Sequence, residues 1–315
     1  MKRLGQSALL FIALGLALYA GLYFAAERLM LHTARSNPFF KIAAMHDSEV
    51  DWVILGASHA MPLDFTDFNA YMQRETGLRI LNLAAPGTGP LYNRFVLEHF
   101  LRAHRAKNVL YVVDAFAFYS RSWNEERFAD TKLLRRTPLE PAIAALLSDY
   151  VRHEGVDPRA LLDYVAGFSK INNRERFRLD AWEGEGQFER VYRPSASGVK
   201  KRIAYLYPDN TTAAALNRYL ETLSTVIATA RRAGAGVVVV KMPTPAQYRS
   251  QLPDEAGFDL ALARLLAAAD VQYRDFSRAI DEPQFYFDSD HLNRDGLTQF
   301  FARDLKPILA SAKRN

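Results

Sequence analysis

Apolar residues are unevenly distributed along this chain, and the longest run without a charge comes first. After Met1-Lys2-Arg3, the stretch from Ser7 to Ala26 is almost entirely apolar and contains no charged residue. About twenty apolar helical residues span the roughly 30 Å hydrocarbon core of a bilayer. The run is long for a secretory signal, and no convincing small-x-small cleavage motif precedes Glu27. The pattern predicts an uncleaved anchor in residues 1–26, which contacts the membrane through residues 5–26.

The charges beside this run predict its orientation. Lys2 and Arg3 favour retention of the N-terminus in the cytoplasm, which sends the rest of the chain outward. No later apolar run is long and uninterrupted enough for a second span. We therefore expect a single-pass inner-membrane protein whose main domain lies in the periplasm, or otherwise outside the cytoplasm. Residues 27–49 are predicted to form a juxtamembrane stalk, in which Asn37-Pro38 stops any helix that continues from the membrane.

From Val50 onward, short apolar runs alternate with stretches of helical periodicity. The runs predict five strands, at Val50–Leu55, Leu78–Ala84, Val109–Val113, Gly236–Met242 and Val271–Phe276. The intervening periodicity predicts helices at Asp64–Thr76, Leu91–Arg105, Thr212–Ala233, Phe258–Ala269 and Arg294–Ala312. Continuously apolar strands that alternate with helices are typical of a parallel sheet covered on both faces. The fold class is therefore α/β, with three α/β/α layers around a mainly parallel five-stranded sheet.

The alternation fails between residues 117 and 210. This stretch contains Trp123, Trp182, many arginines and the loop-like Glu183-Gly184-Glu185-Gly186. We interpret it as an insertion within a domain that covers residues 50–315. Two alternatives stay open for it, a loop-rich lid with solvated charges or a surface for a substrate or partner.

Composition excludes several classes of function. The 315 residues include 40 cationic and 35 anionic side chains, which give a formal charge of +5. No basic block is interleaved with aromatic residues, so we expect no nucleic-acid partner. The absence of cysteine excludes disulfides, thiolate metal sites and thiol catalysis.

The candidate nucleophile follows the first predicted strand. Gly56-Ala57-Ser58-His59 ends the apolar run Val53-Ile54-Leu55, which places Ser58 on the turn that leaves a buried strand. The carboxyl ends of parallel strands meet at one edge of the sheet, where sites in such folds are built. Taken alone, a serine at this position is more typical of a simple turn or a helix cap than of a nucleophile. His59 is expected to line the pocket, because adjacent side chains rarely meet in catalytic geometry.

The candidate base follows the last strand, in Asp288-Ser289-Asp290-His291-Leu292-Asn293. A hydroxyl needs a base to remove its proton, and that base needs an acid to fix its tautomer. The spacing of three allows Asp288 to reach Nδ1 of His291, while Nε2 faces a nucleophile. Asp290 is expected to point elsewhere and competes with Asn293 to cap the last helix.

Other residues are candidates for the oxyanion and for substrate. The N–H of Ser58 and that of Gly87 or Gly89 are candidate oxyanion donors, since glycine permits close approach. Asn93, at the start of the next helix, is a weaker side-chain donor. Asp114 ends the third strand and either contacts substrate or caps the following segment.

A metal site is the alternative for the acids around His291. Carboxylate and imidazole groups of Asp288, Asp290 and His291 suit a divalent cation. Nothing else in the sequence completes such a shell convincingly, so neither a metal nor another cofactor is expected.

Together, Gly56-Ala57-Ser58, the loop with Gly87 and Gly89, and Asp288-x-x-His291 resemble the SGNH/GDSL hydrolase superfamily, whose fold is flavodoxin-like. The form Gly-Ala-Ser-His with Asp-x-x-His-Leu-Asn is similar to its membrane-anchored extracytoplasmic branch. That branch includes proteins of alginate O-acetylation and the D-alanyl transfer protein of lipoteichoic acid synthesis. The resemblance covers about residues 48–116 and 212–312. It implies Ser58 as nucleophile, His291 as base and Asp288 as its orienting acid.

The resemblance also implies partners and competing functions. An O-acyltransferase of an exported polysaccharide, most simply an O-acetyltransferase, would need a membrane-embedded protein that exports the acyl group. An esterase or deacetylase would share the acyl-serine intermediate. A catalytically silent scaffold subunit is the third alternative. The family's Gly-x-Asn-Asp block after the third strand is missing, because the chain reads Val113-Asp114-Ala115-Phe116. The second oxyanion donor is therefore unassigned.

Overall fold

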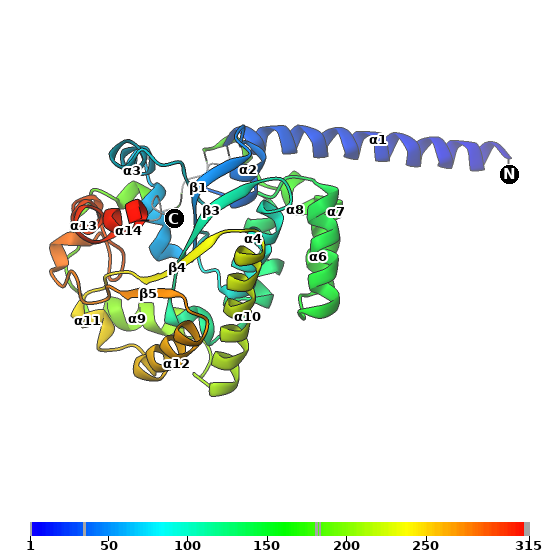
Figure 1. Ribbon diagram of the computed structural model, residues 1–315. Coiled ribbons are helices and arrows are strands. Elements are labelled where there is room, and N and C mark those ends of the chain that lie inside the picture. Colours follow the sequence, from blue (N-terminus) through cyan, green and yellow to red (C-terminus); the bar gives the residue numbers. More distant parts are fainter. Residues whose placement is uncertain (1, 34–35, 180–181, 183, 312–315) are drawn as a thin grey trace. The chain divides into compact units, whose positions relative to one another are not determined.

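The computed structural model describes residues 2–33, 36–179, 182 and 184–311 and forms two compact units. Unit 1 consists of Met1–Ala43 and Phe128–Asp180, and unit 2 of Ala44–Arg127 and Ala181–Asn315. Figure 1 colours both along the sequence. Residues 128–180 thus group with the N-terminal helices, whereas the sequence predicts one domain from residue 50 onward.

Unit 2 is built on a five-stranded parallel sheet of order β2-β1-β3-β4-β5 (Figure 1). The strands are β1 Glu49–Leu55, β2 Ile80–Asn82, β3 Arg105–Val112, β4 Gly236–Lys241 and β5 Gln272–Asp275. The predicted α/β fold class is confirmed. In a sheet of this order, sites form at the carboxyl ends of the strands where the direction of winding reverses, here between β1 and β3.

The central strands form because their residues are buried on both faces. Val53, Ile54 and Leu55 in β1 are fully buried, as are Val109 and Leu110 in β3. Such strands read as unbroken apolar runs rather than as alternating ones. The edge strand β5 is mostly exposed, and it begins and ends one residue inside the predicted strand.

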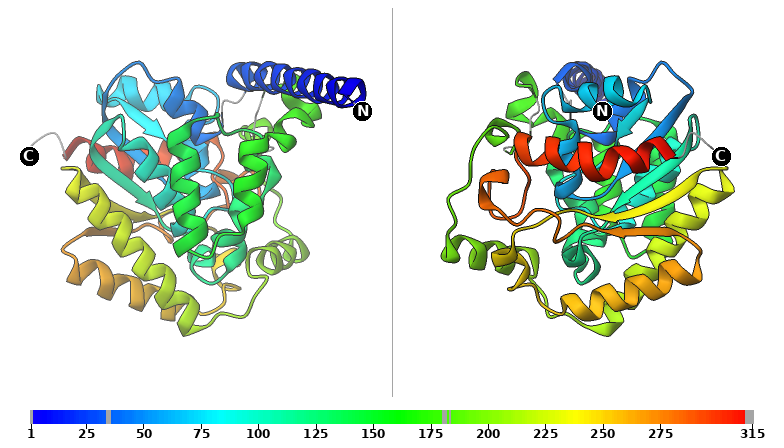
Figure 2. Two further views of the ribbon diagram at one scale, coloured as in Figure 1. Left: turned by 90° about the vertical axis from the view of Figure 1, so that its right-hand side faces the viewer. Right: turned by 60° about the vertical axis from the view of Figure 1, so that its left-hand side comes forward.

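Helices cover both faces of the sheet, as Figure 1 and the two views of Figure 2 show. On one side lie α4 Pro90–Phe100, α10 Ala213–Arg232 and α12 Glu255–Ala268. On the other lie α3 Phe68–Thr76, α13 Arg294–Phe300 and α14 Lys306–Ser311, whose side chains share a core with Trp52 and Ile54. A π-helical segment, Phe301–Leu305, joins α13 to α14. Ala312, the predicted end of this closing helix, lies outside the described residues.

Two helix ends follow their sequence signals. Gly77 ends α3 in the left-handed conformation, with φ 64°, as predicted. Asn293, not Asp290, caps α13, and its side chain accepts a hydrogen bond from the N–H of Gly296 at 3.0 Å. This leaves Asp290 available for the site described below.

The segment from 117 to 210 contains five short to medium-length helices among its described residues. Its helices are α5 Thr131–Leu134, α6 Pro141–His153, α7 Pro158–Ala166, α8 Phe168–Ile171 and α9 Ala196–Leu206, with short 3₁₀ turns before and between them. In α6, Ile143, Leu146, Leu147 and Tyr150 are buried at helical spacing. This segment therefore contains helices that the sequence analysis did not predict.

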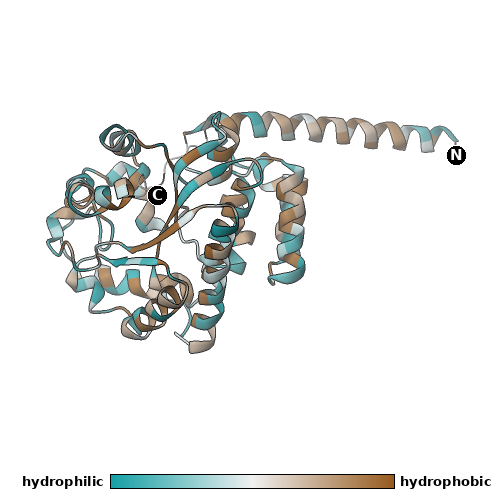
Figure 3. Ribbon diagram, viewed as in Figure 1, coloured by the Kyte–Doolittle hydropathy of each residue, from teal (hydrophilic) through white to brown (hydrophobic). Residues whose placement is uncertain are grey.

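Unit 1 contains the N-terminal helix α1 Lys2–Thr33, which is long and apolar enough to cross a membrane by length and composition. Figure 3 shows α1 predominantly brown beyond its polar start. The helix continues seven residues past the predicted end of the anchor. It is exposed along its first half, whereas Tyr23, Ala26 and Met30 are buried within unit 1. The short helix α2 Pro38–Ala43 follows.

Candidate active site

Ser58 lies directly beyond β1, on a turn that requires glycine. Gly56 has φ +148°, and a Cβ at this position would lie 2.7 Å from the Val112 carbonyl oxygen. Ser58 then opens a 3₁₀ helix, Ser58–Asp64, and its side chain is almost fully buried. The first N–H groups of a helix have no partner within it. The Ser58 N–H is therefore oriented for an acceptor outside the helix, as an oxyanion donor must be.

The loop before α13 positions Asp288 and His291 as the sequence spacing predicts. His291 Nδ1 lies 2.9 Å from each carboxylate oxygen of Asp288. Asp288 Oδ1 also accepts hydrogen bonds from the N–H groups of Asp290 and His291, at 3.0 and 2.8 Å. The His291 N–H and imidazole therefore share one carboxylate, which fixes both the ring and the loop that carries it.

Aromatic rings fix the other faces of the His291 imidazole. Phe287 stacks on it with ring centroids 5.5 Å apart, and Trp182 meets it edge-on at 5.1 Å. His291 Nε2 is buried and makes no hydrogen bond with any described residue. The Ser58–His291 hydrogen bond of a closed triad is therefore not formed in this structure. The ring of His59, the residue next to Ser58, has its centroid 4.8 Å from that of His291.

His59 is held between two carboxylates, a role that the sequence does not suggest. Its Nδ1 binds Asp114 Oδ1, and its Nε2 lies 3.3 Å from Asp290 Oδ2, an ion-pair distance without hydrogen-bond geometry. Burial alone would favour the neutral ring, but Asp114 and Asp290 raise the pKa of His59 to about 10. His59 is therefore an imidazolium at neutral pH.

Asp114 follows β3 and is buried beneath this imidazolium. Its side chain makes no capping hydrogen bond to the 3₁₀ turn Ala115–Phe118. Of the two predicted roles, the cap is wrong. Contact with substrate stays a prediction, and the observed partner is His59.

Asp290 connects His59 to a cation from the 117–210 segment. Arg202, in α9, donates from Nε to both oxygens of Asp290, at 3.1 and 2.9 Å, and its Nη2 lies 2.9 Å from Oδ2. Asp290 is completely buried. Although burial penalises its charge, His291, Arg202 and His59 hold the pKa of Asp290 well below its usual range. The result is a buried chain of alternating charge, Arg202–Asp290–His59–Asp114.

The loop after β2 contains Gly87 and Gly89, the two alternatives that the sequence offers for a backbone donor. The N–H of Gly89 donates to the Trp123 carbonyl at 2.6 Å and is therefore occupied. Asn93 is also occupied, because Oδ1 accepts from the Gly56 N–H at 3.0 Å and Nδ2 donates to the Gly89 carbonyl at 2.9 Å. Asn93 thus braces the Ser58 turn against this loop instead of facing an oxyanion. Ser58 and Gly87 remain the candidate backbone donors.

The imidazoles and acids also form a cluster with metal-ligand chemistry. Donor atoms of His59, Asp290 and His291 lie within 4.8 Å of one another. This set differs from the predicted alternative, because His59 replaces Asp288. A cation there would compete with the Arg202 guanidinium for Asp290 and with the proton on His59.

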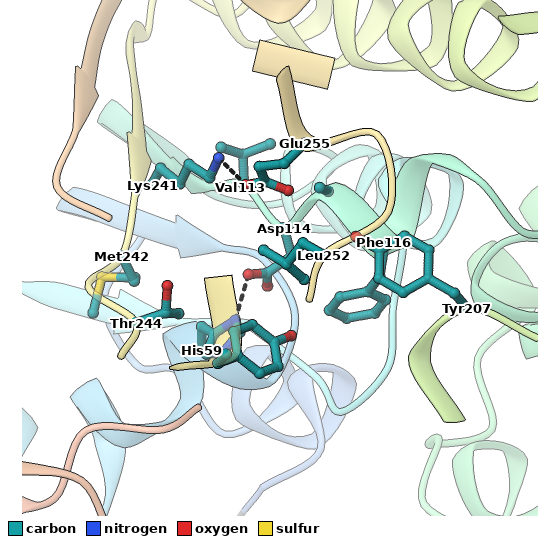
Figure 4. Close-up of a pocket in the computed structure, with 12 residues that line it drawn as sticks. His59, Val113, Asp114, Phe116, Tyr207, Lys241, Met242, Thr244, Leu252 and Glu255 are labelled. Atoms are coloured by element: carbon teal, nitrogen blue, oxygen red, sulfur yellow. Dashed lines mark hydrogen bonds and ion pairs between the residues drawn. The ribbon is translucent and has the colours of Figure 1, made fainter. Parts of the chain in front are cut away.

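Two cavities flank the site within unit 2. The first, of about 20 Å³, lies between His59, Asp114, Lys241 and Tyr248 (Figure 4). Figure 4 shows the Asp114 carboxylate directed at the His59 ring. A cavity of this size holds about one water molecule and no substrate. The second, of about 210 Å³, is lined by Tyr192, prolines and Ser289, a residue of the Asp288–His291 loop.

Three contacts of the site have no local sequence signal. Arg202 lies 88 positions from Asp290, and Trp182 lies 109 positions from His291. The Asp114–His59 pair joins the ends of two neighbouring strands and is 55 positions apart. The strand ends of His59 and Asp114 were predictable, but their pairing depends on the order of strands in the sheet.

Comparison with known proteins gives limited similarity. No family model matches the chain, and no curated protein matches it. Among solved structures, the chain is similar to a protein from Bacteroides fragilis described as a "putative acylhydrolase". The two are 8% identical with a TM-score of 0.44, over 87% of this chain and 95% of that one. The function proposed below therefore rests on the residues of the site.

Proposed function

We propose that this protein is a membrane-anchored serine O-acyltransferase that transfers an acyl group, most simply acetyl, to an exported or cell-surface polysaccharide. Ser58 is the nucleophile, His291 the base and Asp288 its orienting acid. The observation that carries the proposal is the Asp288–His291 pair. The buried His291 Nε2 has no hydrogen-bond partner among the described residues, and the His291 ring lies against that of His59, the residue next to Ser58.

The proposed reaction has two balanced steps. Ser58 Oγ attacks the donor's acyl carbonyl while its proton passes to His291 Nε2, and that proton then leaves with the donor's alcohol. A sugar hydroxyl next gives its proton to His291 and attacks the acyl-serine. Collapse of the second intermediate returns the proton to Ser58 Oγ and releases the acylated sugar. Backbone N–H groups of Ser58 and Gly87 stabilise each oxyanion.

The apo geometry is compatible with this role. Catalytic hydrogen bonds are often long before substrate binds and shorten in the reactive complex. The His291 ring is already fixed by Asp288, Phe287 and Trp182. The mechanism further requires that Ser58 Oγ come within hydrogen-bond distance of His291 Nε2 when substrate binds.

Contacts within unit 1 support a retained anchor. Glu27 binds the ammonium of Lys170, whose side chain is 2% exposed. Cleavage on the N-terminal side of Glu27 would remove Tyr23 and Ala26, which are buried in this unit. A signal peptide that is discarded has no reason to form part of a folded core. If Lys2 and Arg3 stay in the cytoplasm, as their charge favours, the proposed site lies in the periplasm.

The cavity of about 210 Å³ is the proposed acceptor site. Ser289, which lies between Asp288 and His291 in the sequence, forms part of its wall, together with Tyr192, Pro194 and Pro245. Flat apolar walls suit the C–H faces of a sugar ring, and Gln247 supplies a polar group. Because acyl-CoA is cytoplasmic, a membrane-embedded acyl-exporting protein is the proposed donor partner.

The primary test is covalent labelling of the intact chain. A fluorophosphonate and a chromogenic acetyl ester should both react with the wild-type protein. Ser58→Ala should abolish labelling and lower ester turnover by at least about 10³-fold. Ser48→Ala, an exposed serine just before β1, is the control and should behave as wild type. Full labelling of Ser58→Ala would overturn the assignment.

Acceptor competition separates transfer from hydrolysis. With oligosaccharide present, a transferase forms acylated sugar at the expense of free acid, whereas an esterase forms only acid. Tyr192→Ala should raise the KM for the acceptor and leave hydrolysis of the chromogenic ester unchanged. An equal loss of both activities would argue against this acceptor site.

A further inference from the structure

We infer that the C-terminal end of α7 and the start of α8 are immersed in the outer leaflet of the same bilayer that α1 crosses. The inference concerns unit 1 alone. It depends on the anchor part of the proposed function and not on the chemistry of Ser58.

Exposed apolar side chains cluster at this turn. Leu162, Val165 and Phe168 are 69%, 56% and 62% exposed. Leu162, Val165 and Ala166 are three and four positions apart, so they lie on one face of α7. Single exposed apolar residues are ordinary, but a contiguous group indicates an interaction surface.

The turn is joined to α1 within the predicted span. Tyr19 Oη donates a hydrogen bond to the Ala166 carbonyl at 2.9 Å. Gly167, with φ +66°, packs so tightly on Tyr23 that a Cβ there would overlap the ring. Both tyrosines belong to the charge-free run Ser7–Ala26. The apolar surface therefore has a fixed position along the membrane-crossing helix.

The position along α1 gives the depth. At about 1.5 Å per residue, Tyr19 lies roughly 10 Å inside the outer boundary that the sequence sets at Ala26. Amphipathic helices at membrane surfaces bury their apolar face by about 5–10 Å. In Figure 1 the α6–α7 pair runs across the direction of α1, the orientation of a helix that lies along a membrane surface. Arg159, exposed one turn before Leu162 on the same face, is then at headgroup level.

A second exposed aromatic residue of unit 1 provides an internal reference. Phe177 is 67% exposed, but it follows Arg176, whose carbonyl accepts a hydrogen bond from Thr33 Oγ1 at 3.3 Å. Thr33 lies seven residues beyond Ala26, or roughly 10 Å on the aqueous side of the boundary. Leu162 and Phe177 thus have similar exposed fractions but lie on opposite sides of the expected membrane boundary.

The chain has no cysteine, so single-cysteine variants allow specific labelling of the intact protein. Leu162→Cys, Phe168→Cys and Phe177→Cys would each carry an environment-sensitive fluorophore. The labelled protein is reconstituted in nanodiscs of phosphatidylethanolamine and phosphatidylglycerol that contain spin-labelled lipid. All three positions are exposed, and thermal unfolding of each variant would verify its folding.

We expect blue-shifted emission and several-fold stronger lipid quenching at positions 162 and 168 than at 177. Quenching at Leu162→Cys that does not exceed that at Phe177→Cys would overturn the inference. A surface that instead binds a membrane protein would give this second result, since the nanodisc contains no partner. Failure of the protein to enter nanodiscs would overturn the anchor and this inference together, while loss of fluorophosphonate labelling would affect only the proposed chemistry.

Discussion

Unit 2 contains two buried histidines, each bound through Nδ1 to an aspartate, and their surroundings give them different chemistry. His291 is hydrogen-bonded through Nδ1 to Asp288, whose side chain is 37% exposed, and its Nδ1 lies 3.8 Å from Asp290 Oδ1, while its Nε2 has no hydrogen-bond partner among the described residues. His59 lies between Asp114 and Asp290, both buried, and its pKa is raised to about 10. A base must be able to lose its proton near neutral pH. His59 is a fixed cation because each of its two ring nitrogens faces a buried carboxylate, whereas at His291 both carboxylates lie on the Nδ1 side.

The largest effect should come from replacing the unoccupied histidine. His291→Gln should lower ester turnover by about 10³-fold or more with little change in KM, because it removes the proton acceptor. His59→Gln removes no proton acceptor and should cost far less turnover. Steady-state kinetics on both folded variants measures the difference. Equal losses in turnover would contradict the division of roles.

For stability we expect the opposite, with larger losses from changes around His59 than from changes around His291. Asp114→Asn leaves the buried His59 cation with one partner fewer, and breaking a buried ion pair costs about 3 kcal/mol of unfolding free energy. Denaturant unfolding of the full-length protein in detergent measures this cost. The double variant with His59→Gln should lose less than the sum of the single variants. Strict additivity would mean that the two side chains do not interact.

A smaller effect is expected at the acid that orients His291. Asp288→Asn keeps the size of the side chain but no longer stabilises an imidazolium, so turnover should fall by about 10²-fold. The same change should alter stability less than Asp114→Asn does, since Asp288 is partly exposed. A cost in stability equal to that of Asp114→Asn would show that both carboxylates are structural.

The smallest effect is the dependence of stability on pH. Because the folded pKa of His59, about 10, exceeds the unfolded value near 6.5, its stabilisation is complete below about pH 6.5. It is lost as pH rises toward 10, by at most about 1.4 kcal/mol per pH unit. The free energies of unfolding at pH 7 and pH 8 should therefore differ less in His59→Gln than in wild type. His46→Gln, an exposed histidine, is the control and should retain the wild-type difference.

Features set by local sequence were predictable. The buried strands β1, β3 and β4 appear as unbroken apolar runs, because a strand covered on both faces has no polar side. The contact between Asp288 and His291 follows from a spacing of three, since both residues lie in one tight loop. Ser58 was placed correctly at a strand end, although its role as nucleophile stays a prediction.

Features set by distant contacts were not predictable. The charge on His59 depends on Asp114 and Asp290, which reach it only when three separate segments meet. Arg202 comes from a segment that lacks the strand-helix alternation, and its partner is 88 positions away. The helices between residues 117 and 210 do not alternate with strands, so the strand-helix pattern did not predict them, although α6 has buried residues at helical spacing.

The loop from Asp288 to His291 has consequences for insertions and deletions. Asp288 and Asp290 are two positions apart and have different partners. Asp288 binds the His291 imidazole, and Asp290 pairs with Arg202 in the buried chain of charges. A shift of one position along this loop would turn both carboxylates away from their partners at once. Changes in length within these four residues should therefore not be tolerated. An alignment of true homologues would keep this spacing even where the surrounding sequence has diverged completely.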